Sequence, residues 1–247
     1  MKITNFTIHR NYTIMCKLFS PETISIKRIV IGVHGFAGDK ESSMLEKLAE
    51  KLVEVGTALI CFDFPAHGKS PVAETMLTVE NCKEDLLAVA EYIRKKYPDA
   101  EKSIFATSFG GYIALLCYDL LLEFKFVLRA PAVTMPELLL TNVLHISADT
   151  FKSQGFAECG FERKIKLPYS FYAELLKQEN PLRKDYQNSM LIVHGDRDDI
   201  VPFDVIKDFS EKHSHIKLHI IEGANHRFKN TGEIDQIVAV TGHFLGI

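Results

Sequence analysis

Short runs rich in Ile and Val alternate along most of this chain with longer segments whose apolar residues recur at helical spacing. This alternation is typical of a parallel β-sheet covered by helices on both faces. The expected strands are 29–33, 57–62, 103–107, 126–129, 190–193 and 216–221. The expected helices are 43–55, 79–97, one beginning near Gly110, 203–213 and 234–244. We therefore expect an α/β fold built on a mostly parallel, twisted sheet.

The alternation is interrupted once, over residues 131–188. That interval is too long for a structureless loop inside a compact domain, and it carries helical and strand-like patches of its own at 161–167 and 172–176. A chain of 247 residues fits a single domain of this class. We expect one domain over 1–247, with 132–188 inserted as a cap.

The charge balance limits the kinds of partner. The 29 basic and 32 acidic residues give a formal net charge of -3. This provides no broad basic field for nucleic acid or an anionic membrane. We expect a small-molecule substrate and no nucleic acid, and the sequence does not indicate an oligomeric state.

Cysteine usage and the apolar stretches predict a compartment. The five cysteines are odd in number and contain no C-x-x-C pair, which favours a reducing compartment and no zinc site. Residues 1–19 lack an uninterrupted apolar stretch of signal-peptide length. The most apolar stretch, 112–128, is broken by three charged residues and is shorter than the roughly 20 residues that span a bilayer. We therefore expect a cytoplasmic protein without a membrane span.

A candidate nucleophile lies where a predicted strand passes into a predicted helix. Residues 106–110 read Ala-Thr-Ser-Phe-Gly, and this strand-to-helix context is the one that a nucleophile elbow requires. Such a turn holds its serine in strained backbone geometry and needs small neighbours, which Gly110 and Gly111 provide. Ser108 is the predicted nucleophile, and the amide of Phe109 is one predicted donor to an oxyanion.

A serine hydroxyl needs a histidine base, and that histidine needs a carboxylate partner. His226 follows the last predicted strand, at the carboxyl end of the sheet, where sites of α/β proteins lie. The preceding strand runs into a loop that offers three carboxylates, Asp196, Asp198 and Asp199. The order nucleophile, acid, histidine is that of the α/β-hydrolase arrangement.

An ordered set of motifs resembles a known family over nearly the whole chain. The set comprises the Ser108 turn, the two late loops and four further motifs, namely His34-Gly35-Phe36 with Lys40-Glu41, Phe62-Asp63-Phe64, His67-Gly68-Lys69-Ser70 and Arg129-Ala130-Pro131-Ala132. It resembles α/β-hydrolase serine esterases of the cinnamoyl (feruloyl) esterase-like group, related to the serine aminopeptidase and monoglyceride lipase branch.

The resemblance implies further site residues. The acid of that family is the fourth residue of a G-x-x-D-x-x-V pattern, which corresponds to Asp198 here. The family's second oxyanion donor corresponds to the backbone amide of Phe36. A Phe-Tyr pair of the group is matched at Tyr172, a candidate contact for substrate.

The combined expectation is a serine carboxylesterase that cleaves small to medium esters, with aryl esters among them, through an acyl-enzyme and without a cofactor or metal. Three alternatives stay open. Aminopeptidase-type amide cleavage would need an acidic pocket, for which Glu137, Glu158 and Glu162 are candidates. A thioesterase or acyltransferase would use the same acyl-enzyme. A non-catalytic ligand receptor would usually carry an incomplete triad.

Overall fold

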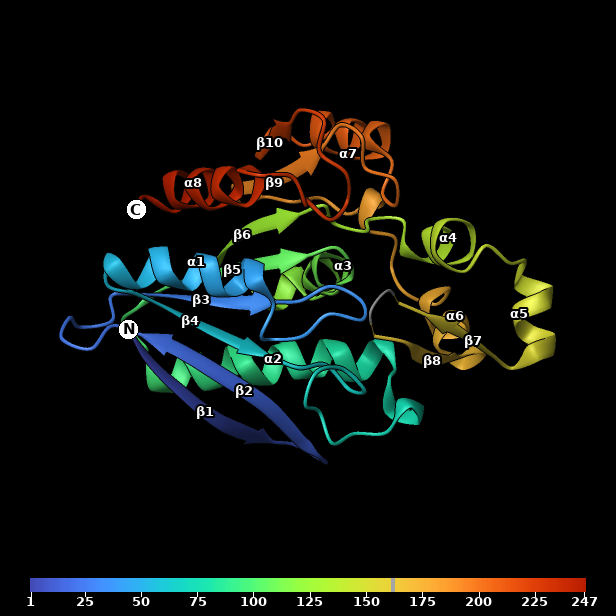
Figure 1. Ribbon diagram of the computed structural model, residues 1–247, viewed down its shortest axis with the longest axis horizontal. Coiled ribbons are helices and arrows are strands. Elements are labelled where there is room, and N and C mark those ends of the chain that lie inside the picture. Colours follow the sequence, from blue (N-terminus) through green and yellow to red (C-terminus); the bar gives the residue numbers. More distant parts are fainter. Residues whose placement is uncertain (161–162) are drawn as a thin grey trace.

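The computed structural model describes residues 1–160 and 163–247, and most of its strands form one mixed sheet (Figure 1). Within the described residues this sheet has eight strands in the order β1-β2-β4-β3-β5-β6-β9-β10. All neighbouring strands from β4 to β10 are parallel, whereas β2 is antiparallel to both β1 and β4. The bounds are β1 Lys2–His9, β2 Thr13–Ser20, β3 Arg28–Val33, β4 Thr57–Phe62, β5 Glu101–Thr107, β6 Phe124–Arg129, β9 Met190–Gly195 and β10 Ile216–Ile221. The predicted parallel α/β sheet is confirmed.

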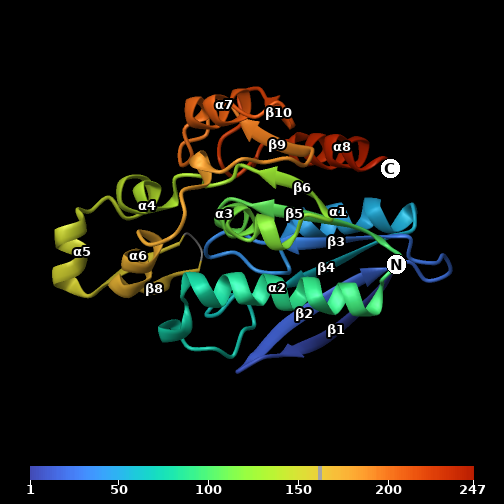
Figure 2. The ribbon, with the colours of Figure 1, turned by 180° about the vertical axis from the view of Figure 1, so that it is seen from behind.

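Helices cover both faces of this sheet, as the apolar spacing predicts. The main helices are α1 Ser43–Glu54, α2 Val79–Lys96, α3 Phe109–Leu116, α7 Phe203–Glu211 and α8 Glu233–Leu245. The helices α1 and α8 pack on one face, in an apolar cluster with Val30 and Val127, and α2, α3 and α7 pack on the other, with Ile31 and Phe126. Figure 1 shows α1 in front of the sheet, and α2 lies in front in Figure 2. The short helical turns η1 Glu74–Met76 and η2 Tyr118–Leu120 complete this part.

The interval between β6 and β9 has a structure of its own. Its elements are α4 Met135–Leu138, the π-helical turn η3 Leu139–Leu144, α5 Ala148–Gln154, the antiparallel pair β7 Phe156–Cys159 and β8 Ile165–Pro168, α6 Tyr169–Leu175 and η4 Pro181–Arg183. Figure 1 shows them beyond the carboxyl ends of β3 and β5. Phe161 and Glu162, at the start of the predicted patch 161–167, lie outside the described residues.

Side chains of this interval fasten it to the rest of the domain. The carboxylate of Glu174 on α6 accepts hydrogen bonds from the amides of Val79 and Glu80, in the first turn of α2. A carboxylate there also interacts favourably with the positive end of the helix dipole. The guanidinium of Arg163 donates to the carbonyl oxygens of Ala66 and Gly68. The interval therefore packs on the sheet domain at more than its two chain connections.

The β1–β2 hairpin is a feature that the apolar pattern did not predict. β1 is the edge strand, and most of its residues are exposed. Such a strand needs no apolar run, because water covers most of its surface. Its inner neighbour β2 buries Ile14, Cys16 and Leu18 on the same face of the sheet as α2.

All five cysteines are buried and unpaired. Burial raises the pKa of Cys16, Cys117 and Cys159 to about 12, and raises the pKa of Cys61 and Cys82 as well. Across residues 1–160 and 163–247, no helix combines the length and the apolar character that crossing a bilayer requires.

Candidate active site

Ser108 is the single residue between the end of β5 and the start of α3. Its backbone has φ +50° and ψ -115°, a conformation that costs free energy for any residue except glycine. Hydrogen bonds on both sides hold it. Its amide donates to the carbonyl oxygen of Arg129 at 2.9 Å, and its carbonyl accepts from the amides of Tyr112 and Ala132, each at 3.1 Å. The strained turn predicted at Ser108 is therefore present.

The two glycines after Ser108 are required by close packing. A Cβ atom on Gly110 would lie 2.4 Å from the carbonyl oxygen of His34, and one on Gly111 would lie 2.9 Å from Cβ of Pro131. Both distances are shorter than real Cβ contacts allow. Helix α3 can approach its neighbours closely enough to place Ser108 at the turn only because these positions lack side chains.

Ser108, His226 and Asp198 are hydrogen-bonded in series. Nε2 of His226 lies 3.0 Å from Oγ of Ser108, and Nδ1 of His226 lies 2.8 Å from Oδ2 of Asp198. Oδ1 of Asp198 also accepts from the amides of Ile200 and Val201, at 2.9 and 2.7 Å. The structure thus brings together the three residues predicted from the sequence, which lie after β5, β9 and β10.

The surroundings of Asp198 favour its ionised form. Burial alone would raise the pKa of this carboxyl group, but the hydrogen bond and charge of His226, the nearby His194 and the amide of Val201 hold the pKa below its usual value. The other two carboxylates of the loop have different partners. Asp196 accepts from the amide of Gly223 at 2.6 Å, and Asp199 accepts from the amide of His226 at 3.3 Å.

His194 is a second histidine beside Asp198, and its place in the sequence predicts no catalytic role. Its Nε2 lies 3.0 Å from the carbonyl oxygen of Val201 and 3.5 Å from Oδ2 of Asp198. Burial lowers the pKa of His194, so the ring is neutral near pH 7. A neutral ring that donates to Val201 helps fix the loop that carries Asp198. Such a support role leaves no mark in a single sequence.

A cavity of about 670 Å³ opens at Ser108 and His226. Gly35 and Phe36 line it from the loop after β3, and Met44 and Leu45 line it from the start of α1. Among the described residues of the interval between β6 and β9, those that line the cavity are Asn142, Val143, His145 and Gly160. The cavity therefore lies between the carboxyl ends of the strands and the inserted interval.

The two predicted oxyanion donors flank the serine in different ways. Phe109 is the first residue of α3, and an amide in the first turn has no acceptor within its helix. The loop of Phe36 lies against the elbow, since a Cβ atom on Gly35 would be 3.3 Å from Cβ of Ser108. Phe36 lines the cavity, whereas the Phe109 side chain is fully buried, and the two rings are in edge contact.

Tyr172 has a different setting from the other predicted residues. It is 7% exposed and packs against the rings of Phe151 and Tyr169. Among the described residues that line the cavity beside Ser108, Tyr172 is absent. The structure thus places its ring within the packing of the inserted interval, and substrate contact by Tyr172 stays a prediction.

The loop that carries Phe36 is anchored by a buried ion pair. Nζ of Lys40 lies 2.5 Å from Oδ2 of Asp63, and both side chains are almost fully inaccessible to solvent. The Asp63 carboxylate also accepts from the amides of Lys40 and Lys69, each at 2.8 Å. Both residues lie in motifs of the sequence, Lys40-Glu41 and Phe62-Asp63-Phe64, but the motifs alone indicate no role for either.

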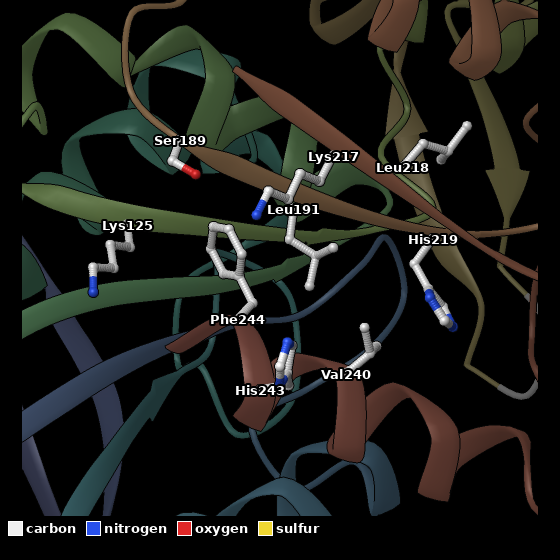
Figure 3. Close-up of a pocket in the computed structure, with 9 residues that line it drawn as sticks. All are labelled: Lys125, Ser189, Leu191, Lys217, Leu218, His219, Val240, His243 and Phe244. Carbon is white, nitrogen blue, oxygen red and sulfur yellow. The ribbon is translucent and has the colours of Figure 1, made fainter. Parts of the chain in front are cut away.

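A second cavity, of about 470 Å³, lies at the other ends of the strands (Figure 3). Lys125, Leu191 and Lys217 line it, close to the starts of β6, β9 and β10, and His243 and Phe244 line it from the last turn of α8. None of the predicted site residues is among the described residues around it. Nor does any group of three or more His, Cys, Asp or Glu side chains in the described chain have a metal-binding arrangement.

The fold and the connections between its elements are those of the α/β hydrolases. The family described as serine aminopeptidase, S33, matches residues 24–169, and the chain belongs to this family. The resemblance seen in the motifs is thereby confirmed. No curated protein sequence gives a significant match.

Solved structures extend this result. Est1E from Butyrivibrio proteoclasticus with bound ferulic acid is similar at a TM-score of 0.81 and 25% identity, covering 97% of each chain. A hydrolase from Agrobacterium vitis S4 has a TM-score of 0.79 at 18% identity and covers 98% of each chain. The esterase domain of a Rhodothermus marinus protein has a TM-score of 0.74 at 18% identity, covering 99% of this chain and 98% of that one.

Proposed function

We propose that this protein is a serine hydrolase that cleaves carboxylic esters through an acyl-enzyme on Ser108. The observation that carries the proposal is the continuous series from Oγ of Ser108 through the His226 ring to the buried Asp198 carboxylate, with distances of 3.0 and 2.8 Å. A hydroxyl is a weak nucleophile until a base accepts its proton. In this proposal, His226 is the base and Asp198 fixes its tautomer.

Acylation begins when Oγ of Ser108 attacks the ester carbonyl carbon while Nε2 of His226 takes the hydroxyl proton. The carbonyl oxygen becomes an oxyanion, for which the amides of Phe36 and Phe109 are the proposed donors. Collapse of the tetrahedral intermediate breaks the bond to the alcohol oxygen, and His226 returns the proton to that oxygen. Asp198 stays ionised and stabilises the transient imidazolium.

Deacylation repeats the sequence with water. His226 removes a proton from water, the hydroxide oxygen attacks the acyl carbon, and the carboxylic acid leaves as Ser108 regains its proton. Thiol esters or another acceptor could enter the same scheme, so thiol esters belong among the test substrates.

The cavity favours small to medium esters, aryl esters included, over substrates that carry an amine. Asp199 is the one carboxylate among its described lining residues, which also include Arg129, Arg227 and His145. An aminopeptidase would need negative charge to hold the substrate ammonium. Glu137 and Glu158 are not among these described lining residues. The ferulic acid bound by Est1E is an aryl acid of a size that suits such a cavity.

We further propose that the inserted interval 132–188 is a cap that shapes substrate choice. Asn142, Val143 and His145 contribute to the cavity from this interval, and Nδ2 of Asn142 donates to the carbonyl oxygen of Ile200 at 2.9 Å. Loops above a fixed site commonly set specificity in such folds.

The test compares hydrolysis of p-nitrophenyl acetate and butyrate by the wild type, Ser108→Ala and the control Ser214→Ala, whose serine is exposed before β10. We expect turnover that resists a chelator, is abolished in Ser108→Ala and is unchanged in Ser214→Ala. Aminoacyl p-nitroanilides and an acyl thioester form the parallel arms. Faster cleavage of an anilide than of any ester, or full ester turnover in Ser108→Ala, would overturn the proposal.

A further inference from the structure

Arg129, the last residue of β6, bonds to two members of the proposed catalytic series. Its carbonyl oxygen accepts from the amide of Ser108 at 2.9 Å. Its side-chain Nη2 donates to the carbonyl oxygens of Arg227, at 2.9 Å, and His226, at 3.5 Å. One residue thus connects the turn of the serine to the loop of the histidine.

The guanidinium of Arg129 is buried without a carboxylate partner. The residue is 9% exposed, and no ion pair involves it within the described part of the chain. Burial lowers its pKa to about 10, opposed by the negative charges of Asp198 and Glu233, so it remains a cation at neutral pH. A buried unpaired cation costs free energy that an apolar side chain would not. Its hydrogen bonds to main-chain carbonyl oxygens offset part of this cost.

The loop that carries His226 is held from two directions. On the side of the Asp198 loop, the amide of Gly223 donates to Asp196, and the amide of Arg197 donates to the carbonyl oxygen of Ala224. On the side of β6, Arg129 binds the two carbonyls, and its guanidinium carbon lies 4.6 Å from the centre of the Phe228 ring. Phe228 has φ +54°, so the loop turns sharply just after His226.

We propose that Arg129 is a positioning residue for His226. It holds the main chain of His226 and Arg227 in the position from which Nε2 of His226 reaches Oγ of Ser108. This inference rests on the proposed function of that site. A base displaced by about 1 Å loses up to roughly 100-fold in rate without weaker substrate binding. The role of Arg129 is therefore visible in kcat and not in KM.

The test uses two variants with different hydrogen-bonding capacity. Arg129→Met keeps length and apolar volume but removes every donor, whereas Arg129→Lys keeps a cation that can reach a carbonyl. We expect kcat for p-nitrophenyl butyrate to fall about 10- to 100-fold in Arg129→Met, with KM within about twofold of the wild type. We expect Arg129→Lys to recover most of the lost kcat.

Arg94→Met is the matched control. Arg94 also donates to a main-chain carbonyl, that of Leu120 at 2.7 Å, and lies over an aromatic ring, that of Phe124. It is on α2, and it is not among the described residues that line the Ser108 cavity. We expect Arg94→Met to keep the wild-type kcat even if its free energy of unfolding falls.

Titration with a fluorophosphonate separates positioning from misfolding. Each variant should label to one equivalent per folded chain, but Arg129→Met should label more slowly, because attack by Ser108 needs the same base. A wild-type kcat in Arg129→Met, an unchanged kcat with a raised KM, or no recovery in Arg129→Lys would each overturn the inference. Turnover that persists in Ser108→Ala would instead overturn the proposed function.

Discussion

Oδ2 of Asp198 lies 2.8 Å from Nδ1 of His226, whereas Asp196, two residues earlier in the same loop, is bonded to the amide of Gly223. These two carboxylates of one loop thus have different hydrogen-bond partners. The backbone between them turns tightly, since the amide of Asp198 donates to the carbonyl oxygen of Gly195. This geometry permits a sharp test of the proposed acid.

Asp198→Asn should lower kcat for ester hydrolysis by about 10,000-fold with little change in KM, because an amide in that place favours the wrong tautomer of the histidine. Asp196→Asn is the control and should stay within a few-fold of the wild type. The measurement is steady-state hydrolysis of p-nitrophenyl butyrate at neutral pH. Equal losses in the two variants would argue against Asp198 as the partner of His226.

Gly110→Ala should destabilise the fold and slow the reaction. The new Cβ would lie 2.4 Å from the carbonyl oxygen of His34, so α3 must shift, at a cost of about 1–3 kcal/mol. Gly242→Ala, in α8, is the control, because its Cβ would lie 3.5 Å from the carbonyl oxygen of Ile247, which is an ordinary van der Waals distance. That change should stabilise the helix by about 0.5–1 kcal/mol. Urea unfolding measures the free energy of unfolding of both variants. Equal destabilisation of the two would contradict the prediction.

Lys40→Met should unfold at a clearly lower temperature than the wild type. The substitution leaves the buried carboxylate of Asp63 without its cation, and breaking such a pair costs about 3–5 kcal/mol. Lys69→Met is the control, since its amine is largely in solvent and its partner Glu41 is partly exposed, so this surface pair contributes little to stability. Calorimetry should show a fall in Tm for the first variant and almost none for the second. Similar Tm values would mean that the Lys40 pair is not required for stability.

Asp85 should make stability fall as pH rises through weakly acidic values. Burial raises the pKa of its carboxyl group to about 6, although Arg10 and Tyr12 donate to it and oppose the shift. The folded state therefore holds a proton that the unfolded chain releases near pH 4. The stabilising contribution is full below about pH 4 and is lost as pH rises through about 6.

Asp85→Asn should abolish this pH dependence. In the wild type it lowers the free energy of unfolding by up to about 3 kcal/mol between pH 4 and 7. Glu50→Gln, at an exposed position of α1, should leave the slope unchanged. The free energy of unfolding in urea at pH 4.5, 5.5 and 7 provides the measurement. A slope that persists in Asp85→Asn would show that other groups cause it.

Much of the fold could be predicted because buried parallel strands are continuous apolar runs. β4 and β9, for example, are buried along their whole length and stand out in the sequence. β1 lacks such a run because its faces are mostly exposed, and the strand order is invisible because pairing depends on the assembled sheet. The elements of 131–188 were not resolved into helices and strands, since they are as short as four residues.

The candidate site also contains residues that the sequence predicts and one that it does not. Ser108 and His226 follow from their places after predicted strands, and Asp198 could be preferred over Asp196 through a family pattern. Arg129 could not be assigned from the sequence. Its bonds go to main-chain carbonyls, which every residue has, so no complementary side chain marks the contact.

The burial of the five thiols makes this chain a natural reporter of its own opening. A thiol reagent attacks only the thiolate, and these groups are both inaccessible and held protonated in the folded state. Alkylation of the native protein therefore has to wait for local or global unfolding. Because the thiols are spread over β2, β4, α2, the end of α3 and β7, the order in which they become modified would reveal which part of the molecule opens first.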